Sequence, residues 1–299
     1  MSSFLEELFS LSSVTEASNV HQNFLDFEKT VSITPTKKKK AVQSMLAIQE
    51  KLTNYFNSIK HLPYYNFDQQ GSYKMGTMVL GKNGIYDIDF GIHSIEKPNI
   101  TPQTLKQHIY KALEGHTLYG TINKDKCIRV LYAGDFDIDV TAYYKTKENL
   151  HAQLATNNGW LISNPVHLIS WYKIQPNNFG QLTRIVKYLK YWANTKQHKM
   201  PSGIALTIWA AKNFKPNERD DIAFYDTVKA IKDSFWWSVE CVNPAAPNDN
   251  LIIKLNDQQK RNFVKYLELL FADAKNAIAQ KNKENAIAIW KQIFGNRFI

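Results

Sequence analysis

Two aspartates separated by one residue, Asp87 and Asp89, are the first positions in this sequence that could do chemistry. Polar and apolar residues alternate over residues 85–92, so a β-strand there would place both carboxylates on one face. Two carboxylates that close together repel each other unless a cation neutralises them, and oxygen ligands of this kind suit Mg2+. The pattern therefore predicts a divalent-metal site for Mg2+, with Mn2+ as an alternative.

A turn rich in glycine and hydroxyl side chains lies shortly before these aspartates. Gly71 and Gly76 allow a tight turn and a close approach of the backbone to a ligand, and Ser72 and Thr77 add hydroxyls. A turn of this kind at a helix start directs several backbone N–H groups at an anion. We therefore expect Gly71, Ser72 and Thr77 to bind the phosphates of a nucleotide.

A further source of carboxylates lies in two strand-like runs, residues 127–132 and 135–140, joined by an Ala-Gly turn. In the second run Asp135, Asp137 and Asp139 alternate with apolar residues and would share one face. If this strand lies beside the strand at 85–92, one of its aspartates completes a cluster of three carboxylates. Three carboxylates and a phosphate-binding turn are the parts of a two-metal site for phosphoryl transfer.

Each motif alone is common on solvated strands and in ordinary turns, but their order and spacing resemble the polymerase-beta nucleotidyltransferase superfamily. Within it, the chain is similar to the cGAS/DncV-like nucleotidyltransferases (CD-NTases) of bacterial anti-phage defence. The resemblance implies that Asp87, Asp89 and Asp139 are the catalytic, metal-binding triad. The third aspartate of the family precedes a Pro-Ala-Tyr-like segment. Residues 141–143 occupy that place here and lack the proline.

Downstream, residues 181–192 have the periodicity of a helix with an apolar stripe. Arg184, Lys187 and Lys190 recur at steps of three and could face an anion together, although cations at this spacing usually form a solvated face. The resemblance implies that Lys190 reaches the nucleotide triphosphate, and we expect Lys187 to assist it. Ser202 resembles the hydroxyl that meets the phosphates at the next helix start, with ordinary helix capping as the alternative.

Two adjacent acidic residues in this second part, Asp220 and Asp221, could be mistaken for metal ligands. No partner residues for a metal lie near them in the sequence. We expect them to begin a helix or to form salt bridges.

The length of 299 residues and the hydrophobic content of 44% are sufficient for a substantial core. We predict an α+β fold, in which a polymerase-beta-like core, a mixed sheet with flanking helices, packs on a C-terminal helical lobe that closes the nucleotide cleft. The predicted domains are residues 1–172 and 173–299. Helices are expected at 4–11, 20–27, 38–59, 101–113, 166–171, 181–192, 255–279 and 285–294, and a loop at 160–165.

A net charge of +10 can attract nucleic acid or triphosphates, and no separate RNA-binding module is visible. The lysine run at residues 37–40 is expected to be a solvated helix entry. The sequence contains no apolar run of about 18 residues and no secretory signal, so we expect a cytoplasmic bacterial protein without a membrane span. Cys127 and Cys241 are expected to be reduced core thiols.

The resemblance implies a cyclic oligonucleotide synthase. It would join NTPs, including ATP, into a di- or trinucleotide second messenger that activates a separate effector in anti-phage defence (CBASS), without requiring nucleic acid. The alternatives are a linear nucleotidyltransferase acting on RNA or protein, and a catalytically silent protein that senses nucleotides. The bases, the linkage and the activation signal stay open, with Asn164 and Asn178 as candidates for base choice.

Overall fold

The computed structural model describes residues 18–81 and 83–299. The helix expected at residues 4–11 lies outside these residues. The described chain divides into two compact units. We call residues 33–175 and 242–249 the sheet unit, and residues 18–32, 176–241 and 250–299 the helical unit.

This division differs from the predicted domains in two respects, one at residues 18–32 and one at residues 242–249, which belong to the sheet unit. The predicted boundary at 172/173 lies close to the point at 175/176 where the chain leaves the sheet unit. Residues 18–32, however, belong to the helical unit, because α2 (His21–Val31) buries Phe24 and Phe27 there.

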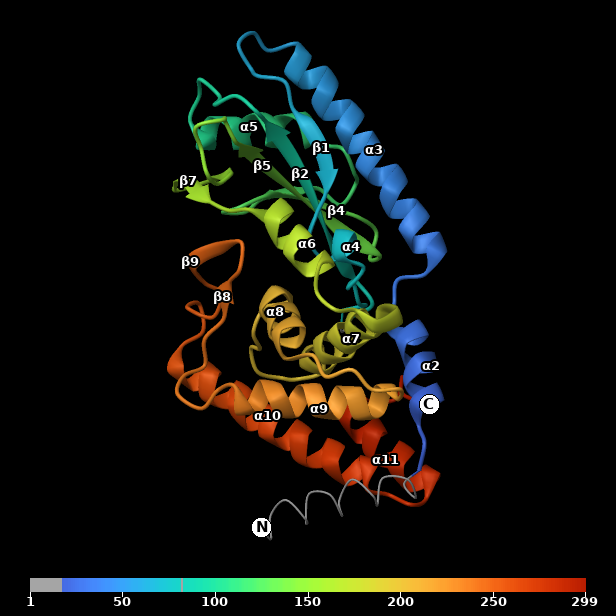
Figure 1. The fold of residues 1–299 in the computed structure, drawn as a ribbon. Helices are drawn as coiled ribbons and strands as arrows, with labels where there is room; N and C mark the ends of the chain where they lie inside the picture. The colour runs from blue at the N-terminus through green and yellow to red at the C-terminus, as the bar shows by residue number, and fades with distance from the viewer. Residues whose placement is uncertain (1–17, 82) are drawn as a thin grey trace. The chain divides into compact units, whose positions relative to one another are not determined.

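The sheet unit is built on a mixed sheet with the strand order β1-β2-β5-β4-β3 (Figure 1). β2 and β5 pair in parallel, and the other neighbours pair antiparallel. β6 pairs with β5 and β7 pairs with β6, so the loop predicted at 160–165 is wrong for residues 160–162. The strands are β1 (Asn66–Gln69), β2 (Tyr86–Ser94), β3 (Thr121–Asn123), β4 (Ile128–Leu131), β5 (Phe136–Tyr144), β6 (Gln153–Thr156), β7 (Gly159–Ile162), β8 (Val242–Asn243) and β9 (Ala246–Asn250).

Two helices cover the apolar face of this sheet. α3 (Pro35–Asn57) begins at Thr34, whose side chain accepts a hydrogen bond from the backbone N–H of Lys37, and it has proline in its first turn. Its buried residues recur at steps of three and four and pack with α5 (Pro102–Leu113) against the strands. The helices predicted at 38–59 and 101–113 are therefore confirmed. The core contains Met45, Ile48, Leu52, Ile88, Phe90, Ile92, Leu105, Ile109, Ile128, Val130, Ile138 and Val140.

The helical unit has a core dominated by aromatic side chains. Phe24 packs edge-on against Trp290 with ring centroids 4.8 Å apart, and Phe27 lies 4.7 Å from Phe294. The helices predicted at 181–192, 255–279 and 285–294 are confirmed to within a few residues. The helices of this unit, besides α2, are α7 (Gln181–Asn194), α8 (Gly203–Asn213), α9 (Asp220–Asp233), α10 (Asp257–Ile278) and α11 (Lys283–Phe294), and a short 3-10 turn, η2 (Asn178–Gly180), precedes α7. Of all the helices in the described ranges, none combines the length and apolar character needed to cross a membrane.

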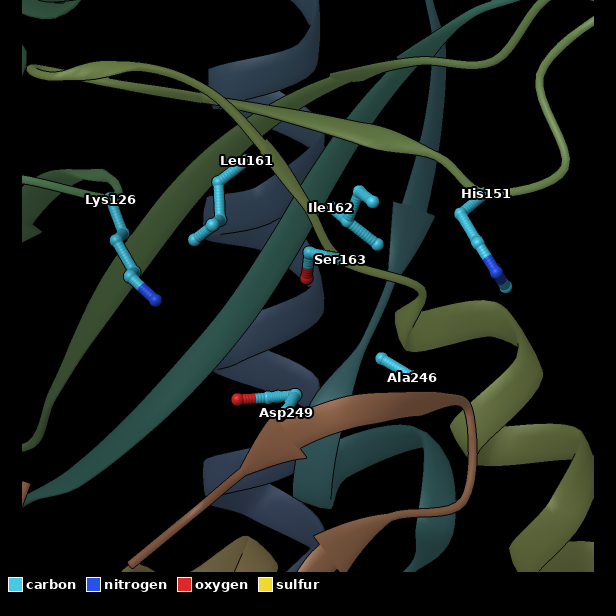
Figure 2. A pocket seen from close by; sticks show the side chains of 7 residues that line it. All are labelled: Lys126, His151, Leu161, Ile162, Ser163, Ala246 and Asp249. Atoms are coloured by element: carbon cyan, nitrogen blue, oxygen red, sulfur yellow. The ribbon is translucent and has the colours of Figure 1, made fainter. Parts of the chain in front are cut away.

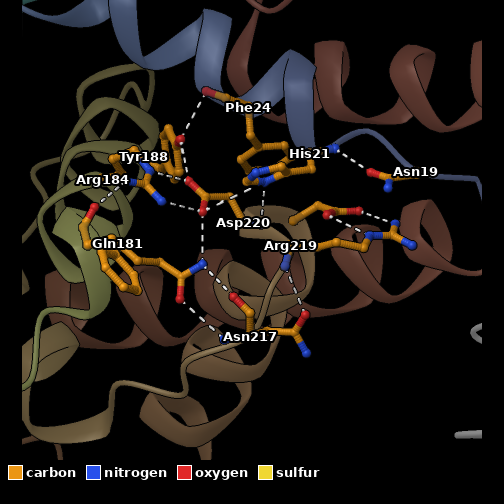
Figure 3. A network of polar contacts seen from close by, with 11 residues as sticks. Asn19, His21, Phe24, Gln181, Arg184, Tyr188, Asn217, Arg219 and Asp220 are labelled. Carbon is orange, nitrogen blue, oxygen red and sulfur yellow. Dashed lines mark hydrogen bonds and ion pairs between the residues drawn. The ribbon is translucent and has the colours of Figure 1, made fainter.

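A buried carboxylate at the start of α9 joins three elements of the helical unit (Figure 3). Asp220 is fully buried and accepts hydrogen bonds from Arg184 Nε at 2.6 Å, Gln181 Nε2 at 2.9 Å and Tyr188 Oη at 2.9 Å. Burial alone would raise the pKa of Asp220, but the hydrogen bonds from Arg184 and Gln181 lower it below its usual value. Its backbone N–H donates to Nδ1 of His21 in α2.

The neighbouring Asp221 is also fully buried and pairs with Arg219 at 2.6 Å. The predicted salt-bridge role of Asp220 and Asp221 is therefore confirmed. The charge of Arg184 is neutralised inside its own unit.

We predict that Asp220→Ala lowers the free energy of unfolding by about 3–5 kcal/mol, because it leaves Arg184 partly buried without its partner. Urea titration followed by tryptophan fluorescence measures this loss. Asp233→Asn, which breaks an exposed pair with Lys232, is the matched control and should change stability by less than about 1 kcal/mol. Equal losses in the two variants would contradict the structural role of Asp220.

Candidate active site

The predicted catalytic aspartates lie on one face of two adjacent strands. In the parallel register of β2 and β5, Asp87 is opposite Asp137 and Asp89 is opposite Asp139. The residues between them, such as Ile88 and the apolar residues of β5, are buried on the other face. Since neighbouring strands lie about 4.8 Å apart, this register places four carboxylates side by side.

A basic residue that sequence analysis did not assign lies within this cluster. Arg129 of β4 is opposite Asp139 in the antiparallel register. Its Nε and Nη2 donate to the two carboxylate oxygens of Asp139, both at 2.7 Å, and its Nη1 donates to Asp137 at 3.2 Å. Nη2 also lies 3.1 Å from Asp87 Oδ1. The guanidinium therefore contacts three of the four carboxylates.

These contacts, together with burial, shift the pKa values of Arg129 and its neighbours. The hydrogen bonds to Asp139 raise the pKa of Arg129 above its already high value, so Arg129 stays charged. Burial raises the pKa of Asp137, which Arg129 only partly offsets. Burial likewise raises the pKa of Cys127 to about 12, and its thiol hydrogen-bonds Asp139. Cys127 and Cys241 are buried thiols outside any disulfide, as predicted.

The predicted phosphate turn lies directly against the carboxylates. β1 leads into Gly71, which opens the short helix α4 (Gly71–Met75) with a φ of +56°. A Cβ atom at Gly71 would lie 1.9 Å from Oδ2 of Asp89, so any other residue at this position would require the Asp89 carboxylate to move. The backbone N–H of Thr77 closes the turn on the carbonyl of Ser72 at 2.9 Å, and the Thr77 side chain is buried.

A polar contact beneath the turn fixes it to β2. The side-chain amide of Gln70 lies 2.6 Å from Nε2 of His93. A Cβ at Gly91 would lie 2.0 Å from this amide, so Gly91 makes room for the contact. The His93 ring stacks on Tyr143 of β5 with centroids 4.8 Å apart, and burial lowers the pKa of His93.

Asp135 lies outside the carboxylate cluster. It pairs with Lys40 at 2.6 Å and with Lys37 at 3.6 Å, both from the first turns of α3. Two lysines of the run predicted as a solvated helix entry are therefore in ion pairs. Asp135 belongs to this surface cluster rather than to the carboxylates around Arg129.

The predicted phosphate-binding residues of the helical unit separate into two environments. The ammonium group of Lys187 donates hydrogen bonds to the carboxylate of Glu28 and, at 2.9 Å, to the hydroxyl of Ser32. Lys190 is buried beside the start of α8, because a Cβ at Gly203 would lie 3.2 Å from its Cε and 3.7 Å from its Nζ. The Ser202 hydroxyl caps this helix by accepting from the N–H of Ala205. The structure thus brings Lys190 and Ser202 together, while Lys187 neutralises an acidic residue of α2.

A cavity of about 280 Å³ lies in the sheet unit, among β7, the loop before α6 (Pro165–Lys173) and the β8–β9 hairpin (Figure 2). Its polar lining is supplied by Lys126, His151, Ser163 and Asp249, and its apolar lining by Leu161, Ile162 and Ala246. Asp249 accepts a hydrogen bond from the Asn243 amide at 3.1 Å. Sequence analysis did not predict this cavity, because its walls come from distant parts of the chain.

The two candidates for base choice lie elsewhere. Asn164 is buried at the start of α6, with its amide nitrogen 2.9 Å from Nδ1 of His167. Asn178 begins η2, and the next residue, Phe179, is exposed. Neither asparagine is among the residues that line the cavity.

The donor chemistry of the carboxylate face fits a hard divalent cation. Four carboxylates against one guanidinium leave a negative surface of oxygen donors, which Mg2+ and Mn2+ prefer. Within the described ranges, no three acidic, histidine or cysteine side chains already converge as a metal cage. The carboxylates at 87, 137 and 139 are instead directed at Arg129.

Known proteins match both the sequence and the fold. Residues 19–176, more than half of the chain, match the family model described as Second Messenger Oligonucleotide or Dinucleotide Synthetase domain. A cyclic AMP-AMP-AMP synthase of Acinetobacter sp. is 27% identical over 149 residues, which span 46% of this chain and 43% of that relative. A c-di-GMP synthase of Roseivirga ehrenbergii is 23% identical over 269 residues, covering 76% of this chain and 71% of that protein.

Among solved structures, the Vibrio cholerae di-nucleotide cyclase DncV, a mutant in complex with ATP, GTP and 5MTHFGLU2, has a TM-score of 0.78 at 17% identity. That match covers 94% of this chain and 97% of DncV. The Bradyrhizobium diazoefficiens CD-NTase CdnG in complex with GTP has a TM-score of 0.77 at 16% identity and covers 94% and 96% of the two chains. The predicted fold class, an α+β nucleotidyltransferase core with a helical C-terminal region, is confirmed.

We predict that Gly71→Ala destabilises the protein more than a left-handed backbone alone would. Gly115→Ala is the control, since Gly115 has a φ of +67° but no atom within 4 Å of an added Cβ. The control should lose about 1–2 kcal/mol of unfolding free energy, and Gly71→Ala should lose more because Asp89 must also move. Urea denaturation of both variants measures the difference. Equal losses of unfolding free energy in the two variants would show that the close approach of Gly71 to Asp89 does not contribute.

We also predict a pH dependence of stability from His93. Burial lowers its pKa in the folded protein below the ordinary 6.5, so the unfolded chain takes up the proton first as the pH falls. The contribution of neutral His93 is therefore complete above about pH 6.5 and is lost progressively below it. His93→Gln should flatten the dependence of the urea midpoint between pH 7.5 and 5.5. His198→Gln, at an exposed position, should retain it.

Proposed function

Because the chain belongs to the family of Second Messenger Oligonucleotide or Dinucleotide Synthetase domains, we propose that it is a nucleotidyltransferase that makes a cyclic di- or trinucleotide from NTPs. The observation that supports this most is the register of β2 and β5. In this register Asp87, Asp89 and Asp139 share one face of the sheet, and Asp89 lies against Gly71 of the glycine turn, which supports a joint role for them.

In this proposal Asp87, Asp89 and Asp139 hold Mg2+ or Mn2+. Ions held there would supply a lower pKa for the attacking ribose hydroxyl and compensation of charge on the α-phosphate. The 2′- or 3′-hydroxyl of one nucleotide forms a new P–O bond to the α-phosphorus of the next. The bond between the α-phosphorus and the bridging oxygen breaks, and pyrophosphate leaves. A further transfer of the same kind, in which the terminal hydroxyl of the linear product attacks its own α-phosphorus and another pyrophosphate leaves, closes the ring.

The remaining predicted residues would bind phosphates. The turn that contains Gly71, Ser72 and Thr77 lies beside Asp89, and backbone N–H groups at the start of α4 would suit a triphosphate. Thr77, whose N–H closes the turn on Ser72, would hold its shape. Lys190 and Ser202 lie together in the helical unit and would contact the same part of a nucleotide. Lys187 lies on the same helix as Lys190, α7, and its hydrogen bond to Glu28 fixes its side chain there. It would assist Lys190 in binding phosphate.

The cavity of the sheet unit is our candidate for a nucleobase site. Lys126 can donate to ring nitrogen or carbonyl acceptors, Asp249 can accept from ring N–H or amino groups, and Ser163 can do either. Leu161 and Ile162 offer apolar contact to a planar ring. The names of the two relatives give different products, a cyclic trinucleotide of AMP and a cyclic dinucleotide of GMP. The mass of the product will identify the base and the ring size for this chain.

We further propose that the product is a second messenger, activating a separate effector in bacterial anti-phage defence (CBASS), with the enzyme acting in the cytoplasm. The protein would need no nucleic acid partner. Its charge of +10 is compatible with attraction of triphosphates.

The testing experiment incubates the purified protein with all four labelled NTPs and Mg2+ or Mn2+, followed by phosphatase, chromatography and mass spectrometry. We predict a phosphatase-resistant product with the mass of a cyclic di- or trinucleotide. Asp87→Asn combined with Asp89→Asn should lower its formation at least about 1000-fold, because residues that act as one catalytic unit fail together. Asp135→Asn, which lies outside the carboxylate cluster, is the matched control and should retain activity.

Phosphatase-sensitive linear products would favour the alternative, a transferase acting on RNA or protein. NTP binding without pyrophosphate release would favour a nucleotide sensor. Full activity of the double variant would refute the carboxylate mechanism.

A further inference from the structure

The guanidinium of Arg129 occupies the carboxylates that the proposed reaction needs for metal ions. Its fork engages both oxygens of Asp139 at 2.7 Å, and the same group contacts Asp87 at 3.1 Å. Arg129 and its partner Asp139, a member of the proposed triad, are largely shielded from solvent, with side-chain exposures of 17% and 16%, so water screens their attraction only partly. Arg129 is thus a cation fixed by the fold at the centre of the candidate metal site.

A divalent ion and this guanidinium cannot both keep their best positions. A side-on Arg–carboxylate pair uses the inward-facing lone pairs of both oxygens. A metal ion bound to Asp139 would have to take one of these lone pairs or bind within a few ångströms of a positive charge. Both choices weaken binding of the metal as long as Arg129 stays in place.

The position of Arg129 on the sheet allows it to move away from Asp139 without a change in fold. β4 holds the residue through backbone pairing with β5, and the long aliphatic stem of its half-buried side chain can rotate on the carboxylate face. Its second partner, Asp137, is adjacent to Asp139 on the same strand, and its Nη1 contact there is the longer one, 3.2 Å. Rotation toward Asp137 would keep an ion pair while it frees Asp139.

We propose that Arg129 is a resident counter-cation that divalent metal must displace from Asp139, so that Arg129 sets the metal affinity of the site. This inference rests on the proposed function in one respect, that Asp87, Asp89 and Asp139 bind the metal. In the metal-free protein the guanidinium offsets the repulsion between the carboxylates. In the metal-bound protein the displaced guanidinium adds positive charge beside the ions, where phosphates would bind.

The first test measures binding of Mn2+ alone, from the electron paramagnetic resonance signal of free Mn2+, so it does not depend on activity. Arg129→Gln should bind Mn2+ at least about 10-fold more tightly than the wild type, since one competing charge is removed. Lys124→Gln, which also removes one positive charge from the sheet unit, should change the affinity less than about 2-fold. Asp139→Asn should weaken binding in both backgrounds.

The second test compares the wild-type protein with and without metal, and a variant serves only to assign the signal. The Nε–H of Arg129, hydrogen-bonded at 2.7 Å, should give a protected signal in 15N NMR spectra, assigned by its absence in Arg129→Lys. Saturating Mg2+ should abolish or shift this signal. An unchanged signal at saturation, or equal Mn2+ affinity in Arg129→Gln and wild type, would overturn the inference while leaving the proposed function intact. No Mn2+ binding by either protein would overturn both.

Discussion

Repulsion between aspartates on one face of the central strands is the constraint on which the rest of this structure depends. Asp87, Asp89, Asp137 and Asp139 are brought together by the parallel register of β2 and β5. That register is fixed from the other side of the sheet, where the alternating apolar residues pack under α3 and α5. A slip of one residue would move every carboxylate into the core, so the core and the charged face specify each other.

The helical unit also contains a carboxylate that needs positive partners, but there the carboxylate is fully buried. The carboxylate of Asp220 is buried completely and is satisfied by Arg184, Gln181 and Tyr188, all from α7. Such a group contributes little net stability compared with an apolar core, but it allows only one arrangement of its partners. With α7 held in this way, Lys190 is fixed beside the start of α8. Charge in this unit sets geometry through one buried carboxylate with three partners from α7, whereas on the sheet three carboxylates share the single guanidinium of Arg129.

The sequence predicts those features that depend on local pattern. Alternation at 85–92 and 135–140 predicts the strands and the side on which their aspartates lie, and the spacing in 38–59 predicts α3. The assignment of a catalytic role to the triad came from resemblance and stays a prediction. Arg129 was missed because its role depends on the register between β4 and β5, which no periodicity encodes. The ion pair between Lys187 and Glu28, which ties α2 to α7, was also missed, because it joins residues that are distant in sequence. Strands β6 and β7, of four residues each, are too short to show a period.

The parallel pairing of β2 with β5 also governs the order in which this protein can fold. Parallel neighbours require a crossover, and here α5, β3 and β4 lie between the two strands in the chain. Closing such a segment costs entropy before any contact is gained, so non-local pairs of this kind form slowly. During synthesis the two halves of the carboxylate face cannot meet until β5 has left the ribosome. A nascent chain that ends before β5 therefore holds Asp87 and Asp89 on an unpaired strand edge, and the proposed active site is completed late.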